Sequence, residues 1–325
     1  MTQTSSKAAA WLNRNSDFAA SLDADETEFA ALRFGSVNIE EGLRDEKRVG
    51  AIADNSDLSK PRWIALATET EEATGKIAEE LRRRSGLLGP TYPFTVSGNT
   101  LRYAASRSGV YEFCLAATVT ESLTKKPFNK LPVAFERLCR EISLLLFGSR
   151  SVSVRTGWPR DKNDGLPLKA KALFGKIEAM TGEWTWNPEP DLPTDPSPKY
   201  FKELGLDLLT WIPMPDGRVG HAFILGQCTC GKTDWFEKRK EPDIALLRRW
   251  FRPLMAVQQP LKCLFVPFHI SNIGALRDVT TAGVTLDRAR ICLLAEDHLH
   301  ASESAKGYWE FVRLVAGPKI DPPAN

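Results

Sequence analysis

The sequence of 325 residues has no long hydrophobic run. Its apolar stretches are short, such as Leu144–Phe147, whereas a membrane-spanning helix needs roughly 20 consecutive apolar residues. The amino-terminal segment also lacks the apolar core of a signal peptide. These absences predict a cytoplasmic protein without membrane association, whose six cysteines are reduced thiols.

An excess of one charge sign is also missing. The chain has 43 lysines and arginines against 41 acidic residues, which leaves a formal net charge of +2. A general polyanion-binding surface is therefore not indicated, and any contact with nucleic acid must come from local basic clusters. Hydrophobic residues make up 42% and charged residues 26% of the chain, which excludes a largely disordered chain, a collagen and a disulfide scaffold.

Several chemical motifs are absent. Neither GxxxxGK[ST] nor GxGxxG occurs, which disfavours a nucleoside triphosphatase. A zinc site at Cys228-x-Cys230 with His221 and Cys263 stays open, although there is no second cysteine knuckle. A nucleophilic thiol at Cys228 or Cys230 also stays open, but nothing in the sequence places His221 or His269 beside it.

The chain divides by composition into a tail and two domains. Residues 1–27 are small and polar, and predict a flexible tail. Residues 28–126 predict an α+β domain, and residues 127–325 a second domain with an insertion at 149–203. In the first domain we expect a helix over 70–86 and strands over 61–68, 92–96, 100–104 and 109–118.

The second domain shows alternating helix and strand patterns. Apolar residues recur at helical spacing over 133–147 and 242–252, and a further helix is expected in the insertion near 168–181. Strands are expected over 204–212, 221–228 and 261–268, the first two joined by a turn into a hairpin. This order predicts a mixed α/β core within a chain that is α+β overall.

Polar residues in this hairpin indicate a possible site. Asp207 lies among leucines in the first strand, where a carboxylate is costly unless it is paired or binds a metal. Gln227 ends the second strand, so the hairpin brings both to one end of the sheet. Two oxygen donors suit Mg²⁺ or Mn²⁺, and Glu136 on the preceding helix completes the set. Lys232 or Lys238 can then stabilise charge on a phosphoryl group.

This order of elements and residues resembles the PD-(D/E)XK restriction-endonuclease-like superfamily. It is similar in particular to Mrr-like, defence-associated members in which glutamine replaces the second acidic residue, and it covers about residues 130–270. The resemblance implies a mixed sheet flanked by helices and a metal-dependent nuclease that cuts DNA. It also implies an effector subunit of a prokaryotic antiphage defence system that works with protein partners. Asp207 and Gln227 would be metal ligands and Glu136 an auxiliary ligand.

One position departs from the superfamily pattern. In the superfamily, the lysine lies two residues after the acidic or glutamine position. In this sequence that position is occupied by Thr229. The lysine is then Lys232, Lys238 or absent. If it is absent, the alternative function is a catalytically inactive subunit that binds nucleic acid or scaffolds a larger defence complex.

Basic residues follow the candidate site and are the expected contacts to DNA phosphates. Trp235, in the same segment, is the expected stacking partner for a base. The basic residues are Arg239, Lys240, Arg248 and Arg249. An ordinary solvated helix face is the alternative interpretation of the same cluster.

Overall fold

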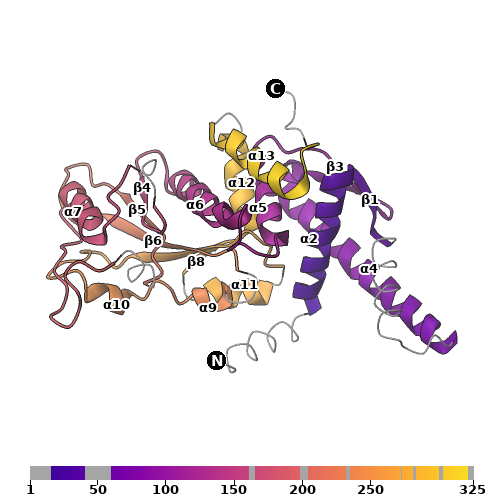
Figure 1. Ribbon diagram of the computed structural model, residues 1–325, viewed down its shortest axis with the longest axis horizontal. Helices are drawn as coiled ribbons and strands as arrows, with labels where there is room; N and C mark the ends of the chain where they lie inside the picture. The colour runs from indigo at the N-terminus through magenta and orange to yellow at the C-terminus, as the bar shows by residue number, and fades with distance from the viewer. Residues whose placement is uncertain are drawn as a thin grey trace. The chain divides into compact units, whose positions relative to one another are not determined.

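The computed structural model describes residues 16–40, 60–160, 165–197, 204–231, 235–271, 273–280, 283–299 and 303–320, and its helices and strands are labelled in Figure 1. The chain forms two compact units. The first draws on Met1–Ser122, Phe268–Ala275 and Arg288–Asn325, and the second on Leu123–Pro267 and Leu276–Asp287. The first boundary lies near the predicted one, but the carboxyl-terminal helices belong to the first unit. Among the described helices, none has the length and apolar character needed to cross a membrane.

The first unit is mainly helical. Its helices are α2 (Ser16–Phe34), α4 (Lys60–Leu88), α5 (Val110–Val119), α12 (Arg288–Leu299) and α13 (Glu303–Ala316), with the short 3-10 turn η1 (Gly89–Thr91). A three-stranded antiparallel sheet in the order β1-β3-β2 accompanies them: β1 (Ser36–Asn38), β2 (Phe94–Ser97) and β3 (Thr100–Tyr103). The α+β character of this region is as the sequence predicted.

Three segments of this unit differ from the sequence prediction. Residues 16–27 belong to α2 and not to a tail, and Asp25 is only 2% exposed. The segment 61–68 continues α4, because a proline in the first turn of a helix costs no hydrogen bond. The segment 109–118 falls in α5, where every residue from Val110 to Thr118 is buried. A helix buried on all sides has no amphipathic period, so its apolar run resembles a strand.

A network of buried charges lies inside the first unit. Arg84 and Arg288 are both 0% exposed, and each places Nη1 2.8 Å from Asp25 Oδ1. Glu28, also fully buried, lies 2.9 Å from Arg84 and accepts hydrogen bonds from the Tyr111 hydroxyl. These contacts join α2, α4, α5 and the start of α12, segments far apart in the sequence.

The second unit is built on a five-stranded mixed sheet in the order β4-β5-β6-β7-β8. Its strands are β4 (Val152–Arg155), β5 (Leu208–Ile212), β6 (Ala222–Cys228), β7 (Leu261–Phe265) and β8 (Val284–Leu286). The first three are antiparallel to one another, whereas β6, β7 and β8 run parallel. β4 lies within the predicted insertion at 149–203, so that segment supplies an edge strand of the sheet. A four-residue strand is too short for a clear alternating pattern.

The helices of this unit largely follow the sequence prediction. They are η2 (Phe128–Lys130), α6 (Leu131–Phe147), α7 (Ala170–Thr181), α9 (Trp235–Lys238) and α10 (Ile244–Arg248), and α11 (Ile273–Thr280) continues into it. The predicted helices over 133–147 and near 168–181 are confirmed as α6 and α7. The predicted helix over 242–252 is shorter, because Asp243 caps α10 by accepting from the N–H groups of Ala245 and Leu246.

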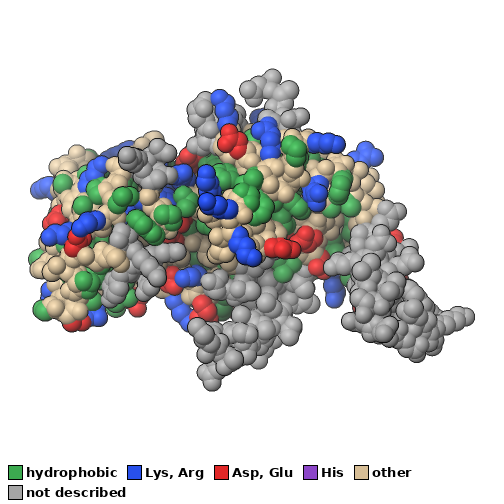
Figure 2. Space-filling view, viewed as in Figure 1, with side chains coloured by type: hydrophobic (Ala, Val, Ile, Leu, Met, Phe, Trp, Pro, Cys, Tyr) green, Lys and Arg blue, Asp and Glu red, His purple; other side chains and the backbone are tan. Residues whose placement is uncertain are grey.

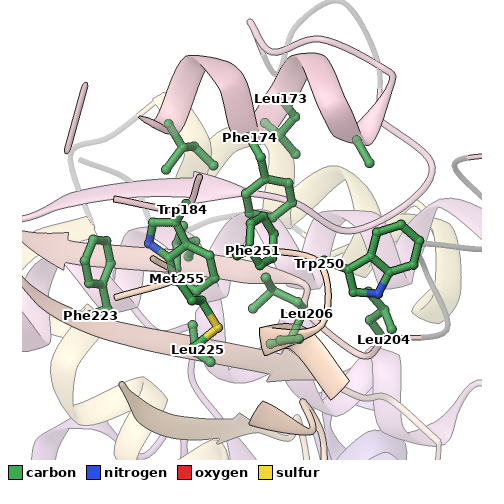
Figure 3. Packing of buried hydrophobic residues seen from close by; sticks show 14 of the residues in the cluster. Leu173, Phe174, Trp184, Leu204, Leu206, Phe223, Leu225, Trp250, Phe251 and Met255 are labelled. Carbon is green, nitrogen blue, oxygen red and sulfur yellow. The ribbon is translucent and has the colours of Figure 1, made fainter. Parts of the chain in front are cut away.

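The two faces of the sheet have different neighbours. Alternate residues of β5 and β6, including Leu209 and Leu225, join a large apolar cluster with α7 and the segment after α10. Figure 3 shows Phe174 packed against Phe251, with ring centroids 4.6 Å apart, and Trp184 beside them. α6 contacts β4, β5 and β6. Within the covered sheet the hydroxyls of Ser153 and Thr210 pair with each other at 2.7 Å, and Asp207 and Gln227 lie at one end, where β5 begins and β6 ends.

Candidate functional site

The paired residues predicted from the sequence meet at one end of the five-stranded sheet. Leu208 of β5 is paired with Gly226 of β6, so one step further along the ladder Asp207 lies opposite Gln227. Side chains opposite each other in antiparallel strands are neighbours on one face. The Asp207 N–H donates to the Gly226 carbonyl at 2.9 Å, and the Cys228 N–H donates to Asp207 Oδ2 at 2.9 Å. The start of β5 and the end of β6 are thereby held together.

The Glu136 side chain, from α6, lies at the same end of the sheet as Asp207. The chain after β4 crosses the start of β5, where the N–H groups of Thr156 and Gly157 both donate to the Asp207 carbonyl, at 2.8 and 3.0 Å. A methyl group at Gly157 would overlap the Glu136 carboxylate and stand 3.1 Å from Asp207 Oδ1. The two carboxylates therefore converge on one glycine, at the end of the sheet that also holds Gln227.

The Glu136 carboxylate is engaged by an arginine that the sequence did not single out. Arg155, the last residue of β4, is 2% exposed and donates from Nε to Glu136 Oε2 at 2.8 Å. It also donates to the Pro159 carbonyl. Two buried opposite charges compensate each other, whereas either alone would be costly. Glu136 thus borders the site with its charge already balanced.

Burial changes the acidity of Asp207. It raises the pKa of this carboxyl to about 6, and the nearby Glu241 carboxylate acts in the same direction. The Cys228 N–H, Lys238 and Arg155 act in the opposite direction by favouring the charged form. At pH 7 to 8, above this pKa, the carboxylate is still mostly ionised.

The side-chain oxygen of Gln227 is buried without a hydrogen-bond donor among the described residues. The residue is 5% exposed, and its Nε2 donates to the Cys228 carbonyl at 3.3 Å. Its Oε1 is buried and accepts no hydrogen bond from any described residue. Such an atom costs about 1–3 kcal/mol, and it typically marks a place for an ion or ordered water. An uncommitted oxygen therefore belongs to the residue that faces Asp207 across the ladder.

One of the two candidate lysines lies within the described residues. Lys232 lies outside the described residues. Lys238, at the end of α9, places Nζ 2.9 and 3.0 Å from the two carboxylate oxygens of Glu241. Thr229, at the superfamily's lysine position, is 8% exposed and its N–H donates to the Phe265 carbonyl. Sequence reasoning missed Glu241, because only the fold brings the segment after α9 toward Asp207.

The expected nucleic-acid contacts near α9 have mixed surroundings. Trp235 is 1% exposed, so it offers no free face for a base to stack on. Arg239 lies over the Phe236 ring, 3.6 Å from its centroid. Lys240 is exposed and paired with Glu237. On the face seen in Figure 2, basic and acidic side chains are interspersed.

Most of the basic residues at the end of α10 and just after it form contacts within the protein. Arg249 pairs with Glu189 at 2.6 Å and with Asp191, and Arg252 donates to the Asn187 carbonyl at 3.0 Å. These bonds attach α10 to the 187–191 segment. Arg248, by contrast, is exposed on the surface, where it can meet a phosphate.

The cysteine alternatives receive no support from the geometry. His221 precedes β6 and Cys228 ends it, so the length of a seven-residue strand, about 20 Å, separates them. Burial and neighbouring acidic groups raise the pKa of the Cys228 thiol well above its ordinary value, which is the opposite of an activated nucleophile. Within the described part of the chain, no group of three or more His, Cys, Asp and Glu side chains is arranged to hold a metal.

Comparison of the chain with protein-family models, with curated proteins and with solved structures finds no match in any of the three.

Proposed function

We propose that this chain is a metal-dependent nuclease of the PD-(D/E)XK type that hydrolyses DNA phosphodiester bonds. The observation that carries the proposal is the uncommitted Gln227 oxygen opposite the Asp207 carboxylate. The order of elements supports it: α6, three antiparallel strands, the helical segment α9–α10, and a strand parallel to the third. The resemblance further suggests a cytoplasmic effector of antiphage defence that acts with protein partners.

The donor set fits a hard divalent cation. Asp207 offers a carboxylate and Gln227 an amide oxygen, and oxygen donors suit Mg²⁺ or Mn²⁺. Glu136 lies at the same glycine as Asp207 and is the auxiliary donor. When bound, such an ion polarises a phosphoryl group and lowers the pKa of water.

The chain's own residues supply the remaining functions. Asp207 carries its negative charge at neutral pH, and Arg155 keeps Glu136 in place. The Lys238 ammonium stabilises negative charge that develops on a phosphoryl oxygen. It takes the place of the lysine that Thr229 does not provide. Arg239, Lys240 and Arg248 contact the DNA backbone on either side.

Two observations favour a second candidate, a catalytically inactive subunit. Thr229 replaces the superfamily's lysine, and Arg155 occupies the carboxylate of Glu136. In this case the chain binds nucleic acid or scaffolds a defence complex, and the site only stabilises the sheet.

A cleavage assay separates the two candidates. Supercoiled plasmid, linear DNA and RNA are incubated with Mg²⁺ or Mn²⁺, with and without chelator. We expect the wild type to cut DNA with metal, Asp207→Asn to lose cutting, and Asp216→Asn to behave as wild type because Asp216 is exposed and paired with Arg218. Manganese binding, followed by electron paramagnetic resonance, should weaken in Asp207→Asn only. DNA binding without cutting under any metal would favour the inactive subunit.

A further inference from the structure

We infer that Glu241 is a positioning residue that holds the Lys238 ammonium beside the Asp207–Gln227 pair, an inference that rests on the proposed function. Lys238 Nζ lies within hydrogen-bond distance of both carboxylate oxygens of Glu241, at 2.9 and 3.0 Å. Two contacts restrict a flexible amine more than one does. The two side chains stay 33% and 31% exposed, so a substrate phosphate can reach the ammonium.

Glu241 is fixed by the segment that leads into β5. A methyl group at Gly205 would stand 2.7 Å from Glu241 Cβ and 2.9 Å from its Cδ. Gly205 also has φ +67°, a conformation that favours glycine. The absence of a side chain two residues before Asp207 thus makes the space in which Glu241 lies.

The segment after α9 is closed by its own backbone. The Glu241 N–H donates to the Lys238 carbonyl at 2.9 Å, so the two residues move as one turn. The charge of Glu241 raises the pKa of Asp207 and the charge of Lys238 lowers it. Both side chains are therefore within electrostatic reach of Asp207. The contact with Gly205 therefore places the whole ion pair next to the candidate site.

A second ion pair in the same segment provides a matched control. Lys240 and Glu237 have the same spacing of three residues, but are 65% and 60% exposed. If the loss of any one negative charge in this segment were enough to slow cleavage, Glu237→Gln would lower kcat as much as Glu241→Gln does. A positioning role predicts that only the second variant acts.

The test compares steady-state cleavage of plasmid DNA with Mg²⁺ by the full chain, five single variants and one double variant. Glu241→Gln should lower kcat between about tenfold and a hundredfold with KM nearly unchanged, and Glu241→Asp should recover part of the loss. Gly205→Ala should also lower kcat by displacing Glu241, whereas Glu237→Gln, which changes the partner of a lysine that contacts the DNA backbone, should keep the wild-type kcat. In the background of Lys238→Gln, Glu241→Gln should cause no further loss.

A structural readout accompanies the kinetics. The Lys238 ammonium signal in nitrogen-15 NMR should be sharp in the wild type and broadened in Glu241→Gln, while thermal unfolding checks that each variant folds. Cleavage by Glu241→Gln at the wild-type rate, or an equal loss with and without Lys238, would overturn the positioning role alone. No metal-dependent cleavage by the wild type would overturn the proposed function together with this role.

Discussion

Gln227 and Glu136 differ in how the fold satisfies their polar atoms. Arg155 balances the Glu136 carboxylate, whereas the Gln227 carbonyl oxygen accepts nothing within the described residues. Asp207 and Gln227 could be selected from the sequence, because a polar residue in an apolar strand needs a reason. Arg155 and Glu241 could not, since an arginine and a glutamate in polar surroundings carry no signal until the fold brings them to the same strand ends.

The amide of Gln227 yields a prediction at this scale. Gln227→Glu places a second carboxylate opposite Asp207, so without metal the two like charges should destabilise the fold by about 1–3 kcal/mol. A divalent cation should then raise the unfolding temperature of the variant more than that of the wild type. The measurement is thermal unfolding with and without Mn²⁺.

Gln259→Glu is the control, because Gln259 is exposed and its new charge is solvated. Equal Mn²⁺ shifts in the wild type and in Gln227→Glu would contradict a metal site at this position.

Helices and strands with a clear period of apolar residues could be predicted from the sequence, whereas an element that is buried on all sides could not. α6, α7, β5, β6 and β7 follow apolar patterns at helical or strand spacing, and the structure has them close to the expected ranges. α5 is buried all round and lost its helical signature. β4 was missed for its shortness, although it supplies Arg155 to the site. The sequence thus predicted the hairpin that bears the site, but not the edge strand that completes it.

Loops of the second unit are joined by one buried acid. Glu183 is 0% exposed, and its carboxylate accepts from the N–H groups of Gly220, His221 and Val257 at 2.8, 3.0 and 2.7 Å. Glu183→Gln turns part of this acceptor into a donor that faces other donors. Hydrogen bonds to a charged group contribute about 1.5–3 kcal/mol each, so we expect a loss of about 3 kcal/mol in urea unfolding.

Asp216→Asn, in the exposed turn before β6, should leave the unfolding midpoint unchanged and serves as the control. A midpoint for Glu183→Gln equal to that of wild type would show that the charged carboxylate stabilises these loops no more than an amide does.

For the whole molecule, the division of the chain was only partly predictable. The composition change near residue 126 lies close to the boundary at Ser122. The return of the carboxyl-terminal segments to the first unit rests on Arg288, which pairs with Asp25 across more than 250 positions of sequence. No local sequence pattern predicts that two residues so far apart in the sequence will pair. The burial of Asp25 also explains why residues 16–27 are helical and not a tail, while residues 1–15 of the expected tail lie outside the described part of the chain.

The same buried network predicts how the first unit responds to acid. His269 is 1% exposed, its Nε2 lies 3.0 Å from the Tyr111 hydroxyl, and Nδ1 has no hydrogen-bond partner among the described residues. Burial, with the charges of Arg84 and Arg288, lowers the pKa of His269 well below its ordinary value. The folded state therefore keeps the ring neutral, whereas the unfolded chain binds a proton near pH 6.5. Stability from this residue is present above pH 6.5 and is lost as the pH falls.

The lost stability amounts to at most about 1.4 kcal/mol for each pH unit below 6.5. His269→Gln removes this titration, so its free energy of unfolding should fall less between pH 7.5 and 5.5 than that of the wild type. Glu28, whose pKa burial raises, acts in the opposite sense but is present in both proteins, so the difference isolates His269. Urea unfolding at three pH values measures it. Parallel curves would mean that His269 takes up its proton over the same pH range in the folded and unfolded states, and that burial beside the two arginines does not lower its pKa.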